Sequence, residues 1–501
     1  MDAKGGRVPD PAPRAVLLAA AVVSLAHFLS FPFRSQAIVT DVRFYLYFAA
    51  QTAMGAVPHR DFFDSKTPLA TFAGAGLVWL GAPLGFSPLP SIRVGYLALA
   101  AVIGVLVFAI HRRLGPAGAL SGALGLAAHL GFPLLGIMPA IGNIPKLLMA
   151  LFAALAALCV GGGRWRAAGA AGALAFMDWQ VGGLVLLACF AAALFEGKGR
   201  GAACRALAAG AALGLLPFLL YFGAHGALPE VWFQVVTSLF SRASRAASFH
   251  QIASVVRVGC RGHLWLVALG AVGLLLYPIY LARAWKGPRA MAIALGVYHG
   301  GVVAFSFWDF QAYGDLFILL FSVAFFAGVA LCEIQAASRG LRSPSRSGLR
   351  ALANVVALAL AVAALRPWES RASQHLQPLG GQARVTLQDQ RTVAERLRSQ
   401  LEQGATGILG PAEQLFLTET RNPIQFVTWS EPVWTYYRRS PQETPAQILH
   451  REISRAKVAV VVTDGSGYPL RHEPARYEPD GVERSGQYEL ARFKVVRAEE
   501  P

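Results

Sequence analysis

The residues best equipped for chemistry lie close together, between residues 40 and 69. This stretch carries three carboxylates, at Asp41, Asp61 and Asp64, and a lysine at Lys66. A carboxylate can act as a general base toward a hydroxyl or amine, and nearby cations can hold a leaving phosphate by charge-assisted hydrogen bonds. The stretch therefore has the minimal equipment for glycosyl transfer from a lipid phosphate. The alternative is that these charges cap helix ends and bind lipid headgroups.

The two halves of this stretch are expected to differ in structure. Apolar residues recur at helical spacing from Asp41 to Met54, which predicts an amphipathic helix lying on a membrane interface. Gly55, Pro58 and Pro68 then interrupt helical structure, so a shaped loop should follow. The cations beside the carboxylates are Arg43, His59 when protonated, Arg60 and Lys66.

The composition indicates a polytopic membrane protein. Of 501 residues, 55% are hydrophobic and only 15% are charged, which excludes an ordinary soluble globular protein. The net charge of +17 could indicate nucleic-acid binding, but the basic residues fall in short clusters between apolar runs, as in membrane proteins. The five cysteines have no metal-binding or disulfide-like spacing.

Eleven membrane-spanning helices are predicted from apolar runs of sufficient length. Their expected positions are 14–32, 93–111, 116–132, 145–161, 166–179, 181–196, 205–223, 263–282, 289–308, 314–333 and 350–366. With the N-terminus inside, every cytoplasmic turn is then basic, as the positive-inside rule requires. The apolar run 68–90 contains three prolines, so we interpret it as a juxtamembrane or re-entrant part of a first outer loop, 33–92.

The composition becomes polar after the last predicted span. Residues 1–366 are expected to form the membrane domain, and 367–501 a C-terminal extracytoplasmic α/β domain. Strands are predicted at 407–410, 423–429, 457–465 and 488–496, with helices in the segments PAEQLFLTETR and PAQILHREISRA between them. No glycine motif for nucleotide binding opens this domain.

Other outer positions carry candidate substrate-binding residues. Lys146 opens a span and could contact a phosphate; the alternative is an ordinary interfacial lysine. Asp178 ends another span and could belong to the site; the alternative is a simple turn between two helices. Arg242 and Arg245 lie with Arg257 and Arg261 in a long outer loop, where lipid-phosphate binding competes with general headgroup attraction. Asp309 and Tyr313 lie in a short outer loop, 306–315.

The first stretch also resembles a known superfamily. It reads DxxFYxxxAxxxxxGxxPxRDFFDxKxPL and is followed by a span that opens at Arg93. This pattern is similar to the GT-C superfamily of membrane glycosyltransferases, and within it to the group of protein O-mannosyltransferases and the bacterial aminoarabinose transferase. The resemblance implies a polyprenyl-phosphate-linked sugar donor and an acceptor on the outer face. It also implies that Asp41 is the catalytic aspartate and that Lys66 is the loop lysine, with Asp61 and Asp64 in the second half of the motif.

Two departures limit what the resemblance implies. Asp41 is followed by Val42 instead of the second acid of the usual pair, so no cofactor is assigned and a divalent metal ion stays open. The late segment WDFQAYGD stands where relatives often have an arginine and a His-Tyr pair. The sugar and the acceptor are therefore not carried over.

The sequence thus predicts an α-helical polytopic membrane protein with about eleven spans, GT-C-like, with a C-terminal α/β domain in the periplasm. We expect a glycosyltransferase of the bacterial inner membrane, with its N-terminus in the cytoplasm. Its expected partners are the polyprenyl-phosphate sugar donor, membrane lipids and a lipid, glycan or protein acceptor, without nucleic acid. The alternatives are a transporter or flippase of a lipid-linked envelope precursor, although no inverted repeat is evident, and a catalytically inactive assembly protein.

Overall fold

The chain is described by a computed structural model. The structure describes residues 14–38, 41–238, 248–284, 288–310 and 313–340 of the predicted membrane domain. In the remaining chain it describes residues 386–402, 411–422 and several shorter segments, among them 408–409, 460–463, 477–485 and 488–495.

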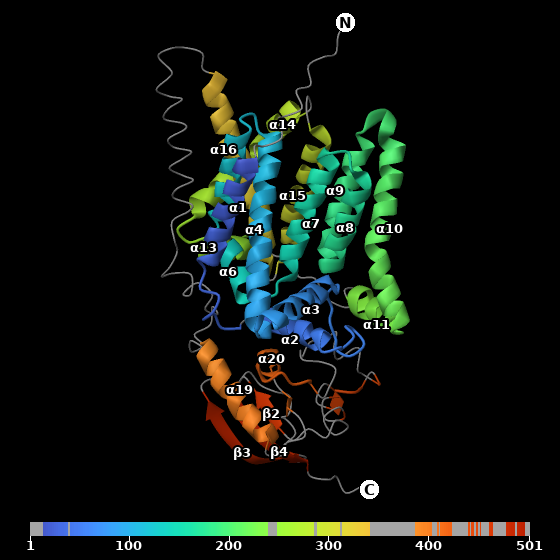
Figure 1. Cartoon of the computed structure of the whole chain (residues 1–501), viewed down its shortest axis with the longest axis vertical. Coiled ribbons are helices and arrows are strands. Elements are labelled where there is room, and N and C mark those ends of the chain that lie inside the picture. Colours follow the sequence, from blue (N-terminus) through green and yellow to red (C-terminus); the bar gives the residue numbers. More distant parts are fainter. Residues whose placement is uncertain are drawn as a thin grey trace.

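A bundle of helices forms the larger part of the structure (Figure 1). Its helices are α1 (Arg14–Leu29), α4 (Pro88–Leu114), α5 (Ala119–Leu130), α6 (Pro133–Ile141), α7 (Pro145–Gly161), α8 (Trp165–Asp178), α9 (Gly183–Leu194), α10 (Arg200–Ala224), α13 (Phe249–Gly259), α14 (Leu264–Ala284), α15 (Arg289–Trp308) and α16 (Tyr313–Gly340). Two further helices, α2 (Val42–Ala53) and α3 (Leu69–Gly81), lie across the lower end of this bundle (Figure 1).

Five described helices are long and apolar enough to cross a membrane, and the number becomes six if the bent pair α5 and α6 forms one span. The five are Pro88–Leu114, Arg200–Ala224, Leu264–Ala282, Arg289–Trp308 and Asp315–Ala337. Shorter apolar helices lie at other predicted positions, α1 and α7 among them. The total of eleven spans therefore stays a prediction, and its last member, 350–366, lies outside the described residues.

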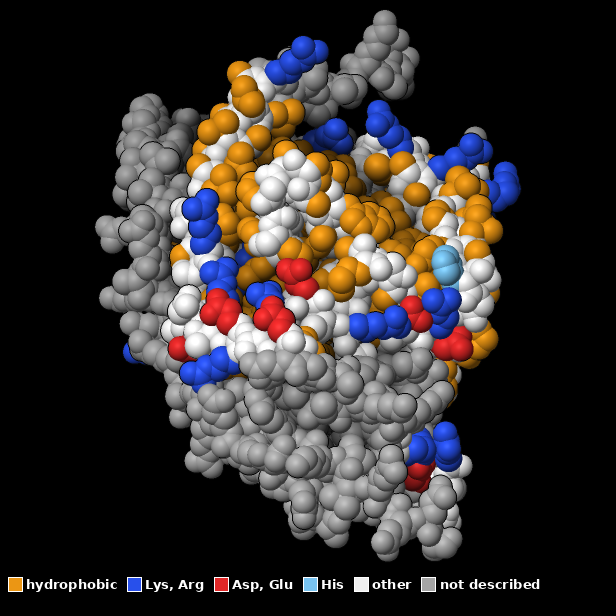
Figure 2. All heavy atoms as spheres, turned by 60° about the horizontal axis from the view of Figure 1, so that its bottom comes forward, with side chains coloured by type: hydrophobic (Ala, Val, Ile, Leu, Met, Phe, Trp, Pro, Cys, Tyr) orange, Lys and Arg blue, Asp and Glu red, His pale blue; other side chains and the backbone are white. Residues whose placement is uncertain are grey.

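Successive helices run in alternating directions through the bundle (Figure 1). The helix α4 begins beside the first loop at Pro88 and ends at the far side with Arg112 and Arg113 in its last turn. Figure 2 shows acidic side chains, with Lys and Arg among them, in a band below a surface of mainly hydrophobic side chains, and further Lys and Arg side chains at the upper edge. On the face shown, charges of both signs thus meet below the hydrophobic surface.

The helix α2 is more deeply buried than an amphipathic interfacial helix would be. Every residue from Tyr45 to Thr52 is buried, including the polar Gln51 and Thr52. The prediction of an interfacial helix was therefore right about the helix and wrong about its surroundings. The reason is that α3 packs on one side of α2 and the short helix α20 (Ala412–Thr418) packs on another, and Figure 1 shows α20 directly beneath α2.

The described part of the C-terminal region contains two helices and a four-stranded sheet. The helices are α19 (Leu387–Glu402) and α20, and the strands are β1 (Ile408–Leu409), β2 (Val460–Thr463), β3 (Tyr477–Ser485) and β4 (Tyr488–Val495). The sheet order is β1-β2-β4-β3, with β1 and β2 parallel and the other pairs antiparallel. Three of these strands lie where strands are predicted, β3 is additional, and the predicted strand 423–429 lies outside the described residues. An α/β domain over all of 367–501 stays a prediction.

The close approach of α2 and α3 depends on one glycine. A Cβ atom added at Gly74 would lie 2.6 Å from the Ala49 Cβ and 2.7 Å from the Asn143 Nδ2. Asn143 is buried, and its amide donates to the carbonyl oxygens of Tyr45 and Ala70. A side chain at Gly74 would therefore disturb both the helix contact and this polar link.

Gly74→Ala is expected to destabilise the protein by about 1–3 kcal/mol, the usual cost of overpacking a close contact. Gly76→Ala is the matched control, because nothing lies within 4 Å of the added atom on the same helix. Thermal denaturation of the purified protein in detergent should show a lower melting temperature for the first variant only. Equal melting temperatures would contradict the close approach of α2 and α3.

Candidate functional site

The loop between α2 and α3 is shaped by Asp61. The Asp61 carboxylate accepts hydrogen bonds from the backbone N–H of Val57 at 2.9 Å and from the guanidinium of Arg60 at 2.9 and 3.1 Å. Arg421, from the C-terminal region, lies 3.8 Å from the same carboxylate. Partial burial raises the pKa of Asp61, but the hydrogen bonds and charges of these partners outweigh it and lower the pKa overall. Asp61 thus binds its own loop and the C-terminal region together.

A second polar group holds the middle of this loop. The Oε1 atom of buried Gln234 accepts a hydrogen bond from the backbone N–H of Asp64 at 3.0 Å. The same Oε1 lies 3.1 Å from the His59 Nδ1. Its amide also donates to the His59 carbonyl oxygen at 2.7 Å. The Asp64 carboxylate, itself buried, accepts from the backbone N–H of Lys66 at 2.9 Å. Asp64 therefore shapes the backbone that presents Lys66.

His59 contributes no cation to the loop at neutral pH. It lies in the left-handed backbone region, with a φ of 66°, and is 1% exposed. Burial lowers the pKa of His59 from 6.5 to about 4, although hydrogen bonds with Gln234 and Asp64 oppose the change. The sequence-based description of His59 as a cation when protonated therefore does not apply near pH 7.

This burial predicts a loss of stability on acidification. Because the folded state resists protonation of His59, stability is fully present above pH 6.5 and is lost as the pH falls toward 4. The loss attributable to this side chain is expected to reach up to about 3 kcal/mol. In thermal unfolding at pH 7 and 4.5, His59→Gln should show a smaller pH effect than the native protein. His225→Gln, at an exposed histidine, should keep the native pH effect; the same pH effect in both variants would refute the prediction.

Two lysines meet at one tryptophan at the lower end of the bundle. The Lys66 ammonium lies 5.5 Å from the ring centroid of Trp179, and the Lys146 ammonium lies 4.5 Å from it. Lys146 also forms an ion pair with Asp315, with Nζ 2.5 Å from Oδ1 and both side chains largely buried. Lys66 comes from the first loop, Lys146 from the start of α7 and Asp315 from the start of α16. We call Lys66, Lys146, Trp179 and Asp315 the two-lysine cluster.

Asp178 supports this cluster from inside the bundle. Its side chain is completely buried, and one carboxylate oxygen accepts a hydrogen bond from the backbone N–H of Met149 at 2.8 Å. The other oxygen has no hydrogen-bond partner among the described residues. Gln180 donates to the carbonyl oxygen of Ser65 at 2.8 Å. The end of α8 thereby holds both α7 and the first loop, with Trp179 between these two anchors.

Asp41 stands at the N-terminal end of α2 with an exposed side chain. It occupies the N-cap position, but its carboxylate makes no capping hydrogen bond. Within the described part of the chain, the carboxylate forms neither a hydrogen bond nor an ion pair. Both oxygens can therefore accept a proton from a bound molecule, and the capping alternative for Asp41 has no support in its hydrogen bonds.

The C-terminal region contacts the chain before α2, α2 itself and the loop after it. The Gln390 side chain accepts from the Ile38 backbone N–H at 2.9 Å and donates to the Ile38 carbonyl oxygen at 2.8 Å. Within α2, the Tyr47 hydroxyl accepts a hydrogen bond from the backbone N–H of Asn422 at 2.8 Å. Together with the Arg421–Asp61 pair, these bonds tie α19 and the segment after α20 to the loop.

The remaining predicted residues are not part of the two-lysine cluster, or cannot be described. Asp309 ends α15 and is half-buried. The backbone of Tyr313 begins α16, but its side chain lies outside the description, and Arg242 and Arg245 lie in an undescribed segment. Among the described residues, no group of three or more His, Cys, Asp or Glu side chains is arranged to hold a metal ion.

Three residues that hold the site were not singled out from the sequence. Gln234 positions Asp64, Gln390 holds Ile38, and Asn143 joins α3, α4 and the start of α7, also accepting a hydrogen bond from the Tyr96 hydroxyl. Asn143 could have been found, since it is a polar residue in a long apolar run directly before the helix-opening Pro145. Gln234 shows the same contrast, because it interrupts the apolar run from Val231 to Val236, whereas Gln390 lies in a polar segment.

The fold is similar to two solved transferases. ArnT from Cupriavidus metallidurans, bound to undecaprenyl phosphate, superposes with a TM-score of 0.57 at 16% sequence identity, over 95% of this chain and 97% of that one. The archaeal oligosaccharyltransferase AglB from Archaeoglobus fulgidus, in complex with an inhibitory peptide and a dolichol-phosphate, superposes with a TM-score of 0.55 at 13% identity, over 97% of this chain and 74% of that one. No family model and no curated protein sequence matches the chain. Both neighbours are GT-C enzymes, so the predicted GT-C resemblance is confirmed at the level of the fold.

Proposed function

Given a GT-C fold, we propose that the chain is a membrane glycosyltransferase that takes its sugar from a polyprenyl-phosphate carrier. The observation that carries the proposal is the two-lysine cluster, in which Lys66 and Lys146 approach the Trp179 ring at 5.5 and 4.5 Å. Two cations beside an aromatic ring at the end of a helix bundle suit a phosphate that is attached to a lipid. The two structural neighbours support this choice, since ArnT is bound to undecaprenyl phosphate and AglB to a dolichol-phosphate.

The proposed reaction divides the work between Asp41 and the lysines. An acceptor hydroxyl or amine attacks the anomeric carbon of the sugar and gives its proton to the Asp41 carboxylate. The bond between that carbon and the phosphate oxygen breaks, and the lipid phosphate leaves with the bonding electrons. Lys66 and Lys146 stabilise the charge that develops on this phosphate. Trp179 keeps the two ammonium groups at its ring, where the cation–π attraction is worth about 0.5–2 kcal/mol.

The other predicted residues receive supporting roles in this proposal. Asp315 holds Lys146, Asp178 holds the helix end that carries Trp179, and Asp64 shapes the backbone before Lys66. Asp61 fixes the loop, so its contribution to substrate binding is indirect. Arg242, Arg245, Asp309 and Tyr313 are retained as candidates for binding donor or acceptor. No step requires a metal ion or other cofactor.

We propose the bacterial inner membrane as the location, with the first loop and the C-terminal region on the periplasmic face. The support is the concentration of Arg112 and Arg113 at the opposite end of α4. In a variant without the native cysteines, a cysteine introduced at position 60 should react with an impermeant thiol reagent in spheroplasts. A cysteine at position 113 should react only after the membrane is opened. The reverse pattern would place the site in the cytoplasm.

The decisive test measures a product that does not depend on the acceptor. The purified full chain in lipid nanodiscs would be given a labelled polyprenyl-phosphate sugar and a membrane lipid extract, and released polyprenyl phosphate would be quantified. Release above that of empty nanodiscs is expected. If the chain instead moves the intact sugar lipid between leaflets of proteoliposomes without cleaving it, the transporter alternative is correct.

A further inference from the structure

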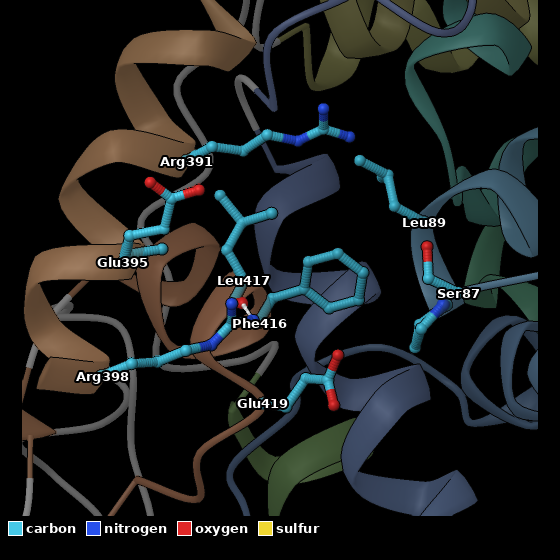
Figure 3. A pocket seen from close by; sticks show the side chains of 10 residues that line it. Ser87, Leu89, Arg391, Glu395, Arg398, Phe416, Leu417 and Glu419 are labelled. Carbon is cyan, nitrogen blue, oxygen red and sulfur yellow. Dashed lines mark hydrogen bonds between the residues drawn. The ribbon is translucent and has the colours of Figure 1, made fainter. Parts of the chain in front are cut away.

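A cavity lies between the C-terminal region and the start of α4, and none of its wall residues belongs to the two-lysine cluster. Its volume is about 340 Å³, which is at the lower end of the range for small-molecule sites. It is lined by residues of α4, α19 and α20 and the residues that flank these helices: Ser87, Pro88, Leu89, Arg391, Ala394, Glu395, Arg398, Phe416, Leu417 and Glu419 (Figure 3). We call it the tail cavity.

The charges of the tail cavity are separated from one another. Figure 3 shows Arg391 at one end and Glu419 at the other, with Phe416 and Leu417 between them. Glu395 follows Arg391 by four residues on α19 and precedes Arg398 by three, so these three side chains share one face of the helix. The cavity is therefore formally neutral, with two guanidinium groups and two carboxylates, and charges of both signs line it.

Most of these charges have no partner within the described part of the chain. The side chains of Arg391, Glu395 and Glu419 form no hydrogen bond or ion pair with a described residue. Arg398 donates to the Leu417 carbonyl oxygen, which fixes its guanidinium in the wall. Arg391 is close enough to the buried Arg93 for the two cations to repel each other. Arg93 donates to the carbonyl oxygens of Phe33 and Gln36 and has no carboxylate partner in the described structure. An anion beside Arg391 would relieve this repulsion.

Glu419 is held in an unusual backbone conformation at the other end of the cavity. It ends α20 with a φ of 58°, in the left-handed region where glycine is the favoured residue. A glutamate at this position costs stability, and its carboxylate is exposed to the cavity. Retaining a carboxylate at such a position is consistent with a role in binding.

Large apolar side chains are exposed on the chain that leads to the tail cavity. Leu84 and Phe86, directly before Ser87, are 70% and 49% exposed, and Trp79 and Leu80 on α3 are 60% and 70% exposed. Several large exposed apolar side chains within one short segment indicate contact with a membrane or a partner. A ligand with a charged headgroup and hydrocarbon chains can use both the cavity and this surface.

We propose that the tail cavity binds the headgroup of a zwitterionic phospholipid that carries a phosphate and a primary amine. The phosphate lies against Arg391, and the ammonium donates to Glu419, with Glu395 as a second acceptor. The lipid chains lie along Leu84 and Phe86. The proposal is independent of glycosyl transfer, because the cavity shares no residue with Asp41 or the two-lysine cluster.

Native mass spectrometry of the purified, delipidated full chain tests the proposal. The probes are phosphatidylethanolamine, phosphatidylcholine, whose amine carries no N–H, and phosphatidylglycerol, which has no amine. Phosphatidylethanolamine should bind at least about tenfold more tightly than the other two, the effect expected of a charge-assisted hydrogen bond. Free phosphoethanolamine should compete weakly; competition as strong as that of the lipid would identify a soluble ligand with the same headgroup instead. Equal binding of the three lipids would overturn the proposal.

Variants separate binding from folding. Arg391→Gln should weaken all three lipids by about tenfold, whereas Glu419→Gln should abolish only the preference for the primary amine. Glu419→Gly should also abolish the preference while raising the melting temperature, because glycine suits the left-handed conformation. The matched controls Arg396→Gln and Glu402→Gln, on the same helix but outside the cavity wall, should bind like the native chain. An equal loss of lipid binding in the control variants would show that general surface charge, and not the tail cavity, attracts the lipid.

Discussion

Asp41→Asn is expected to lower the rate of sugar transfer by about 10²–10⁴-fold, the usual contribution of a general base. The substitution preserves the size of the side chain and removes its ability to accept a proton. Because the Asp41 carboxylate makes no capping hydrogen bond and is exposed, folding and donor binding should be nearly unchanged. The measurements are released polyprenyl phosphate, the melting temperature and the affinity for the donor.

Asp41→Glu distinguishes catalysis from a purely local effect on α2. It keeps the carboxylate but moves it by one methylene group, so a fraction of the activity should survive. If Asp41 served only as a helix cap, asparagine would be nearly normal and glutamate the poorer of the two, since Asn and Asp are similar caps. An asparagine variant with near-native transfer would move the base to another residue.

Lys66→Gln is expected to lower kcat/KM for the donor by about 10–100-fold, because it removes a cation from the leaving phosphate. Lys66 is only partly buried, so the variant should fold normally. The matched control is Arg34→Gln, which removes an exposed cation of the first outer loop that lies over the Phe33 ring and makes no bond to Asp61. Transfer would be followed at several donor concentrations.

Measuring donor binding and turnover separately sharpens this test. The loss should be smaller for binding of the intact sugar lipid than for turnover, since the charge on the phosphate grows as the bond to the sugar breaks. A Lys66→Gln variant with native kcat/KM, or an equal loss in Arg34→Gln, would return Lys66 to the role of an interfacial lysine.

The sequence predicted local structure well where one residue type dictates it. Gly55 adopts a φ of 94° in the predicted loop, and α2 begins at Val42, within one residue of its predicted start. The buried environment of α2 could not be predicted, because the helix that covers it, α20, lies more than 350 residues farther along the chain. A helix with one face against the bundle and another against a distant segment has the same apolar pattern as a helix on a membrane surface.

The candidate site shows the same limit. Lys146 and Asp178 were identified from their positions at the ends of apolar runs, and Lys66 from the charged first stretch and its motif. Their convergence on Trp179 depends on how α7, α8 and the first loop pack, which periodicity does not encode. The Lys146–Asp315 ion pair joins residues 169 positions apart. Likewise, the number of spans could not be settled by hydropathy alone, since only five described helices reach spanning length by themselves.

The bonds from Gln390 to Ile38 and from Arg421 to Asp61 have a thermodynamic consequence. They bracket α2 and the loop that leads to Lys66, so an ordered loop and a docked C-terminal region stabilise each other. Linkage is reciprocal: a ligand that binds the ordered loop more tightly must strengthen docking of the C-terminal region by the same free energy. Ligand binding to the first loop and docking of the C-terminal region are therefore coupled. A change in the docking equilibrium of the C-terminal region would show that the loop has bound a ligand.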